Sequence, residues 1–235
     1  MRVYAVGDIH GRADLLEPML GWIRSDSRSR AREPDVHVVF LGDLIDRGPA
    51  SRGVLDLLVD EHESFGRRHF ILGNHEQALL NAIDGDMAAL DEWLGFGGAA
   101  TLESYGVDPA LQWRNPDALH AKMVAAIPAR HVAFLRAMRP SVRLGGYLFV
   151  HAGIRPGIPL DEQDGRDLRW IRNEFLSSRA DHGVMVVHGH TVSDSVQFRH
   201  NRIGIDTGAY ASGRLSVLGL ERERRWLLVS RSEPT

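Results

Sequence analysis

The chain has 235 residues, 43% of them hydrophobic and 25% charged, which is the composition of a globular protein large enough for one α/β domain with a full core. Its net charge of −3 provides no general positive field, so neither nucleic acid nor a membrane surface is an expected partner. The absence of cysteine excludes disulfides, thiolate zinc sites and a cysteine nucleophile.

Predicted strands and helices alternate over the first 90 residues. Short apolar, β-branched runs predict buried strands at residues 3–6, 36–41 and 69–72. Helices are predicted from the apolar stripe at 15–23 and from the segment 51–62, and the polar residues 25–34 predict a loop. This order predicts parallel strands that are joined by helical crossovers.

The second half of the chain begins with a long helical region and ends with β structure. Residues from about 77 to 140 are predicted to be mainly helical, and glycines and prolines interrupt them. Strands are predicted at 147–150 and 184–187, and the short apolar runs of 196–230 are typical of further strands. Without a repeat or a linker, we expect one domain over residues 1–235, with 77–140 as a mainly helical insertion or cap.

Neither a signal peptide nor a membrane span is expected. No apolar run approaches the roughly 20 residues that cross a bilayer. The first six residues lead directly into a polar motif, without the long apolar region of a signal peptide. The expected location is therefore the cytoplasm.

Five short motifs follow apolar runs, and each places glycine near Asp, Asn or His. They are Gly7-Asp8-Ile9-His10-Gly11, Gly42-Asp43-Leu44-Ile45-Asp46-Arg47-Gly48, Gly73-Asn74-His75-Glu76, His151-Ala152-Gly153 and His188-Gly189-His190-Thr191. The points where strands end are the usual position of an active site in an α/β protein. Carboxylate, amide and imidazole groups together form a ligand set for two divalent metals, so the motifs predict metal-assisted hydrolysis of a phosphate ester.

Spacing and side-chain chemistry suggest individual roles. Asp8 and His10 are two residues apart and point the same way in an extended segment, so both can reach one metal. The carboxylate of Asp43 can bridge two ions. Three residues that follow later strands offer an amide oxygen or an imidazole nitrogen: Asn74, His151 and His190.

Three further side chains of the motifs are candidates for catalysis. His75, beside the predicted metal ligand Asn74, is the candidate general acid. Asp46 is its expected partner, which would orient the ring and raise its pKa. The planar guanidinium of Arg47 can hold the phosphoryl oxygens of the substrate.

The five motifs, in this order, resemble those of the calcineurin-like metallophosphoesterase superfamily over residues 3 to about 220. Within it, the chain is similar to the bacterial branch of the phosphoprotein phosphatases, close to the diadenosine tetraphosphate hydrolases. The resemblance implies a four-layer α/β sandwich, in which two mixed sheets face each other and helices cover the outside. It also implies two metal sites, the first with Asp8, His10 and Asp43, the second with Asp43, Asn74, His151 and His190.

The resemblance also implies a reaction. His75 with Asp46 would protonate the leaving group, and Arg47 would bind phosphate. Family members use a further arginine after the His-Ala-Gly motif, and Arg172 lies in the matching region. Water would attack phosphorus directly, without a covalent phosphoenzyme. Oxygen and imidazole ligands favour Mn²⁺, and Fe or Zn would also fit.

The motifs are compatible with two classes of substrate. The first interpretation is a bacterial serine/threonine protein phosphatase, and the alternative is a hydrolase of dinucleoside polyphosphates such as diadenosine tetraphosphate. The partner would thus be a phosphorylated protein or a small phosphate ester. A non-catalytic binding protein is a third hypothesis, which a missing ligand would favour, but no ligand residue is missing from the motifs.

Four residues near the motifs have two interpretations each. His188 lies two residues before His190 and could support the site from outside the metal shell or act as a ligand itself. Asp206 could orient a ligand histidine or could belong to an ordinary β-turn. Trp93 and Trp170 could line a substrate cleft, for example by stacking on adenine, or could belong to the core.

Overall fold

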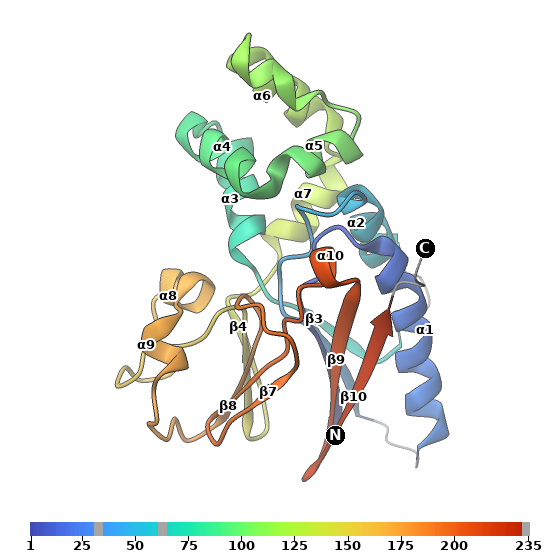
Figure 1. Cartoon of the computed structure of the whole chain (residues 1–235), viewed down its shortest axis with the longest axis vertical. Coiled ribbons are helices and arrows are strands. Elements are labelled where there is room, and N and C mark those ends of the chain that lie inside the picture. The colour runs from blue at the N-terminus through green and yellow to red at the C-terminus, as the bar shows by residue number, and fades with distance from the viewer. Residues whose placement is uncertain (31–34, 61–64, 232–235) are drawn as a thin grey trace.

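The computed structural model describes residues 1–30, 35–60 and 65–231. In these residues, two mixed five-stranded sheets pack against each other, and helices lie on their outer sides (Figure 1). The predicted fold class, a four-layer α/β sandwich, is confirmed.

The first sheet contains the three predicted N-terminal strands. Its members are β1 (Arg2–Val6), β2 (Val36–Phe40), β3 (Arg67–Phe70), β9 (Arg214–Glu221) and β10 (Arg224–Arg231). They lie in the order β10-β9-β1-β2-β3, with β1, β2 and β3 parallel and β9 and β10 antiparallel. The parallel topology is as predicted, although β3 begins and ends two residues earlier than the apolar pattern indicates.

The second sheet contains the later strands. Its members are β4 (Ser141–Leu144), β5 (Tyr147–Val150), β6 (Met185–His188), β7 (Gln197–Phe198) and β8 (Arg202–Gly204). They lie in the order β4-β5-β6-β8-β7, and the three central strands are parallel. The carboxyl ends of the parallel strands in both sheets therefore point toward the motif loops.

Alternation along β1 explains why the two sheets stack. Val3 and Ala5 belong to the apolar cluster between the sheets, whereas Tyr4 and Val6 belong to the cluster under the helices. Successive side chains of a strand point to opposite faces, and all five residues of this strand are buried. A strand covered on both faces is expected for the centre of an α/β sandwich.

The helix α1 (Ala13–Ser29) is longer than its apolar stripe indicates, and the prediction of a loop over 25–34 is wrong for its first residues. The carboxylate of Asp26 accepts hydrogen bonds from Tyr4 Oη at 2.7 Å and from Trp226 Nε1 at 3.0 Å. These tertiary contacts hold the polar last turn in the helix. The last part of the predicted loop lies outside the described residues.

The part of the chain that connects β3 of the first sheet to β4 of the second is mainly helical, as predicted. Its elements, after α2 (Ser51–Asp60) and β3, are α3 (Asn74–Ile83), α4 (Met87–Trp93), the π-turn η1 (Leu94–Gly98), α5 (Ala99–Ser104), the 3₁₀ turn η2 (Pro109–Trp113), α6 (Pro116–Ala126) and α7 (Ala129–Arg136). Figure 1 shows them above the strand ends. Leu102, Leu119 and Leu135 of this region join the same buried cluster as Val6 of β1. The predicted helix 51–62 ends at Asp60 in the described part, and its last two residues lie outside it.

Three short helices border the second sheet and the motif loops. They are α8 (Gly165–Trp170), α9 (Asn173–Leu176) and α10 (Ala209–Ser212). Leu168 of α8 and Phe175 of α9 pack on Val150 and Val186 of the second sheet. This packing places the end of α8 beside the strand ends that carry the motifs (Figure 1).

Candidate metal centre

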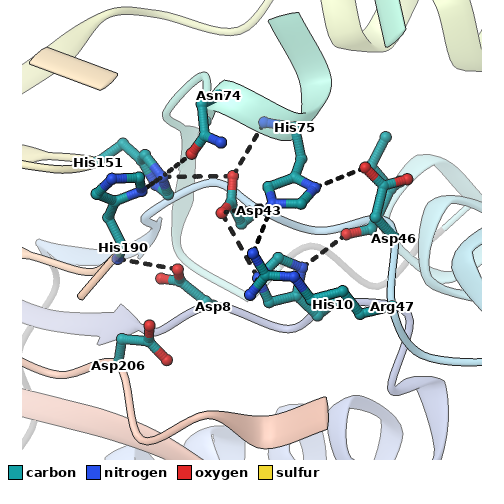
Figure 2. A network of polar contacts seen from close by, with 12 residues as sticks. Asp8, His10, Asp43, Asp46, Arg47, Asn74, His75, His151, His190 and Asp206 are labelled. Carbon is teal, nitrogen blue, oxygen red and sulfur yellow. Dashed lines mark hydrogen bonds and ion pairs between the residues drawn. The ribbon is translucent and has the colours of Figure 1, made fainter. Parts of the chain in front are cut away.

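The five motifs meet in one buried place at the strand ends of both sheets (Figure 2). The predicted ligands come from loops after β1, β2, β5 and β6 and from the first turn of α3. All six are at most 7% exposed: Asp8, His10, Asp43, Asn74, His151 and His190. The structure therefore brings together every residue that the sequence predicts as a metal ligand.

The backbone of the motifs is strained where these side chains turn inward. Among the described residues, six non-glycine residues have a positive φ. One of them, Arg222, lies in the β9–β10 turn, and the other five belong to the motifs: His10, Asp43, Asp46, Arg47 and His190. Left-handed backbone is unfavourable for residues with a Cβ and persists where surrounding contacts impose it, which is frequent at functional sites.

Asp43 lies between two groups of ligand atoms. The groups are His10, Asp43 and His75 on one side and Asp43, His151 and His190 on the other, with the atoms of each group within 4.8 Å of one another. Its Oδ2 lies 3.5 Å from His10 Nε2, and its Oδ1 lies 3.3 Å from His151 Nε2. The two oxygens of one carboxylate thus face different groups, which is the geometry of a bridging ligand.

Hydrogen bonds fix the ring nitrogens that face these groups. His10 Nδ1 lies 2.9 Å from the carbonyl oxygen of Ile45, and His151 Nδ1 lies 2.8 Å from that of Leu41. A carbonyl oxygen can only accept, so each Nδ1 carries a proton and each Nε2 is the ring atom that faces the centre. His151 Nε2 also lies 2.9 Å from Asn74 Oδ1, so donor atoms of different motifs point at one spot.

The donor set fits divalent cations. Asp8 Oδ1 and His190 Nε2 are buried and have no hydrogen-bond partner within the described part of the chain. Unpaired buried polar atoms are costly unless a ligand satisfies them. Carboxylate oxygens, an amide oxygen and neutral imidazoles are together suited to Mn²⁺, Fe and Zn.

Burial and neighbouring carboxylates shift the pKa values of residues in the centre. Burial and then the carboxylate of Asp206 raise the pKa of Asp8 well above its usual range. Burial lowers the pKa of His151, but the Asp43 carboxylate outweighs it and raises this pKa to about 10. The buried carboxylates of the centre thus repel one another and favour positive charge beside them.

His75 and Asp46 form the predicted pair. His75 Nδ1 lies 2.6 Å from Asp46 Oδ2, and Asp46 is fully buried. Burial lowers the pKa of His75, but the carboxylates of Asp43 and Asp46 outweigh it, so this pKa is raised above its usual value. The ring edge of His75 also contacts Phe96 at 5.0 Å between centroids.

Two residues that the sequence did not assign to the site hold Asp46 in place. Trp93 Nε1 donates to its Oδ2 at 2.7 Å, and Thr101 Oγ1 donates to its Oδ1 at 2.6 Å. Trp93 is fully buried, so of its two interpretations the core position is correct, with the indole N–H used in the site. Both residues come from the helical region, 47 and 55 positions along the chain from Asp46.

Glu76 is a further residue that the motif contains but to which sequence reasoning assigned no role. Its buried carboxylate accepts from the backbone N–H groups of Asp43 at 2.9 Å, Leu44 at 2.7 Å and Gly73 at 3.0 Å. It therefore joins the loop after β2 to the start of α3. Burial and the neighbouring Asp43 raise the pKa of Glu76 to about 7.

The two arginines lie at the edge of the centre. Arg47 is exposed and donates from Nη1 to His10 Nε2 at 3.2 Å, and its Nη2 lies 3.1 Å from His75 Nε2. Arg172 is exposed as well, and its Nη1 lies 3.4 Å from Thr191 Oγ1 beside His190. Both guanidinium groups can thus reach an anion bound at the centre.

His188 and Trp170 are placed differently from one another. His188 is buried but belongs to neither group of ligand atoms, and its Nδ1 lies 3.1 Å from the carbonyl oxygen of Gly189. Trp170 is 41% exposed and lies on a groove of about 370 Å³ together with Asn74 and Phe96. Its ring centroid is 6.1 Å from that of His190, so the groove opens beside the centre.

The model of the calcineurin-like phosphoesterases matches residues 1–226 of this chain. The chain belongs to the calcineurin-like phosphoesterase family. The His and Asp groups described above could hold divalent ions. None of the helices in residues 1–30, 35–60 and 65–231 is long and apolar enough to cross a membrane.

Relatives of this phosphoesterase carry two kinds of name. Serine/threonine-protein phosphatase 1 of Salmonella typhimurium is 30% identical over 230 residues, which cover 93% of this chain and 92% of that protein. The symmetrical bis(5'-nucleosyl)-tetraphosphatase of Neisseria gonorrhoeae is 29% identical over 156 residues, or 66% of this chain and 45% of that protein. The match thus spans less than half the length of that relative. A crystal structure of a diadenosine tetraphosphatase has a TM-score of 0.67 at 22% identity, covering 99% of this chain and 95% of that one, which shows the shared fold.

Proposed function

We propose that this phosphoesterase binds two divalent ions, Mn²⁺ being the best match, and removes phosphate from phosphoserine and phosphothreonine in proteins. The first ion would be held by Asp8, His10 and Asp43, the second by Asp43, Asn74, His151 and His190. Such a pair of ions would supply Lewis-acid charge to the phosphoryl oxygens and lower the pKa of a water molecule. The buried, partly unpaired donor atoms of the centre support this assignment.

The observation that carries the substrate class is the buried pair of His75 and Asp46. An alkoxide is a very poor leaving group, so cleaving a serine or threonine phosphate gains most from a proton donor. The leaving group of a nucleoside polyphosphate is itself a phosphate, which departs without one. Asp46 fixes His75 at 2.6 Å and helps to raise its pKa, which favours the protonated ring that a proton donor requires.

Arg47 and Arg172 are the groups that would bind the phosphate. Both are exposed at the edge of the centre, and neither forms an ion pair with a carboxylate within the described residues. A guanidinium can hold two oxygens of a phosphoryl group through its parallel N–H donors. In this proposal, Arg47 exchanges its contacts to His10 and His75 for contacts to the substrate.

A second candidate function rests on the groove beside the centre. Phe96 and Trp170 form a T-shaped contact with 6.2 Å between ring centroids, and the amides of Gln77 and Asn81 line the same groove. Aromatic rings and side-chain amides are the groups that recognise a nucleobase. The groove therefore supports a dinucleoside polyphosphate as the alternative substrate. In either case we infer that residues 77–140 act as a cap and that the enzyme works in the cytoplasm.

The two functions are separated by kcat/KM measured with Mn²⁺ for a phosphoserine/phosphothreonine peptide and for diadenosine tetraphosphate. The proposal expects a preference for the peptide of at least tenfold, and the opposite preference would establish the alternative. Trp170→Ala tests the groove, because it should lower kcat/KM for the dinucleotide but not for a short peptide. Trp113→Ala is its control, since Trp113 is 83% exposed in the helical region and does not line the groove.

A further inference from the structure

Asp206 lies inside the metal centre although it belongs to none of the five motifs. It follows β8, is only 2% exposed, and its carboxylate faces that of Asp8 (Figure 2). Its Oδ1 accepts the backbone N–H of Gly208 at 2.8 Å, which makes an Asx-turn. Of the two interpretations of Asp206, the turn is therefore the one that its Oδ1 shows. No histidine is oriented by this carboxylate in the described part of the chain.

The turn explains one oxygen of Asp206 but not its charge. An Asx-turn needs an acceptor, and asparagine supplies one equally well. A buried carboxylate is unfavourable without a cation, and a second carboxylate beside it makes the position worse. Asp206 and Asp8 nevertheless face each other, and neither forms an ion pair with a basic side chain within the described residues.

The two carboxylate oxygens of Asp8 differ in their contacts. Its Oδ2 accepts the backbone N–H of His190 at 2.9 Å, whereas its Oδ1 is buried and unpartnered within the described residues. The carboxylates of Asp8 and Asp206 lie beside each other (Figure 2). A cation between or beside them would satisfy the free oxygen and offset the repulsion.

The two metal positions of the proposed function differ in their number of ligands. In the proposed function the first ion has three ligands, Asp8, His10 and Asp43, and the second ion has four. Divalent Mn²⁺ accepts more than three oxygen or nitrogen ligands, so the first ion, which has only three, can be stabilised by a further anionic group. Asp206 lies beside Asp8, which is one of the three ligands proposed for the first ion (Figure 2).

We propose that Asp206 is a metal-site residue, whose carboxylate faces that of Asp8 and adds its negative charge to the site of the first ion. This inference rests on the proposed dinuclear centre and extends it by one residue. It requires the charge of Asp206, whereas a turn residue requires only the acceptor atom. The two roles can therefore be separated by replacing the carboxylate with an amide.

The test is titration of the metal-free protein with Mn²⁺ by isothermal titration calorimetry. Wild type is expected to bind two ions. Asp206→Asn keeps the acceptor for Gly208 and removes the charge. It should lower the affinity for one of the two ions by about 10- to 100-fold and leave the affinity for the other unchanged. Asp206→Ser, which retains a hydroxyl acceptor, should show the same loss.

The chain contains a matched control for this substitution. Asp181 Oδ1 accepts the backbone N–H of Gly183 at 2.8 Å, so it makes the same Asp-x-Gly turn, but it is exposed and lies outside the centre. The two glycines even share their backbone conformation, with φ of 67° at Gly208 and 69° at Gly183. Asp181→Asn should therefore bind both ions as wild type does.

Each outcome has a distinct meaning. Two ions bound with unchanged affinity in Asp206→Asn and Asp206→Ser would overturn the role of Asp206 and leave the dinuclear centre intact. Wild type that binds fewer than two ions would overturn the dinuclear centre and this inference with it. The melting temperature of each metal-free variant shows whether it folds, and because Asp206→Asn retains the turn and removes a like-charge contact, it should melt no lower than wild type.

Discussion

Trp93 and Asp46 are joined by a hydrogen bond of 2.7 Å that connects the helical region to the active centre. The indole Nε1 donates to Asp46 Oδ2, the same oxygen that lies 2.6 Å from His75 Nδ1. Trp93 lies at the end of α4, and Asp46 lies in the loop after β2. The position of the candidate acid therefore depends on a helix that contributes no ligand to the metal centre.

Trp93→Phe removes the N–H donor but keeps an aromatic side chain in the core. Asp46 then loses one of the contacts that fix it, and we expect kcat for a phosphoserine peptide to fall roughly tenfold, as for the loss of one hydrogen bond to a charged group. KM should change little, because Trp93 does not line the groove. Trp113→Phe is the control, and an equal loss in both variants would show that Asp46 does not need the indole.

His75→Asn tests the role of the imidazole as an acid. For an alkyl phosphate such as a phosphoserine peptide, the rate should fall by roughly 10²–10⁴-fold. For an aryl phosphate the loss should be much smaller, because that leaving group departs without a proton. Equal losses on both substrates would contradict the assignment, and Mn²⁺ content measured on the same samples shows whether the centre remains loaded.

The pH dependence of the reaction follows from the same pair. An acid works only while protonated, so kcat for an alkyl phosphate should decline as the pH rises through the His75 pKa. Burial lowers that pKa, but Asp43 and Asp46 raise it further, so the decline should lie above the ordinary histidine value of about 6.5. Asp46→Asn removes one of the carboxylates that raise it, so the midpoint of the decline should move to lower pH. A midpoint that stays in place would show that another group limits the rate.

The sequence predicted which residues meet at the centre because their signals are local. Each apolar run leads into a motif that places a glycine near Asp, Asn or His, and parallel strands bring such ends together. Asp8, Asp43 and His151 could therefore be assigned to one centre without coordinates. Glu76 was visible in its motif, but its contacts to backbone N–H groups across two loops were not.

Other features could not be read from the chain because they depend on tertiary contacts. Trp93 and Thr101 look like ordinary helix residues, and only folding brings them to Asp46. A buried tryptophan usually finds a partner for its N–H, but no pattern indicates which one. The helical turn around Asp26 was predicted as a loop for the same reason, since Tyr4 and Trp226 stabilise it from distant strands.

Gly73 precedes Asn74 with a φ of −85°, so its backbone would accept alanine, but the space around it would not. A Cβ there would lie within 3.0 Å of Asp43 Oδ1, its backbone nitrogen and Glu76 Oε2. Because these atoms carry the bridging ligand, Gly73→Ala should weaken Mn²⁺ binding by about 10- to 100-fold and lower the free energy of unfolding by about 1–3 kcal/mol. Calorimetric titration and urea unfolding measure the two effects.

Gly21→Ala is the control, since nothing lies within 4 Å of that position on α1. It should leave Mn²⁺ binding unchanged and raise the free energy of unfolding by about 0.5–1 kcal/mol. If Gly73→Ala bound Mn²⁺ with wild-type affinity, Asp43 could shift without loss of the metal. That result would contradict the role of Asp43 as a fixed bridging ligand.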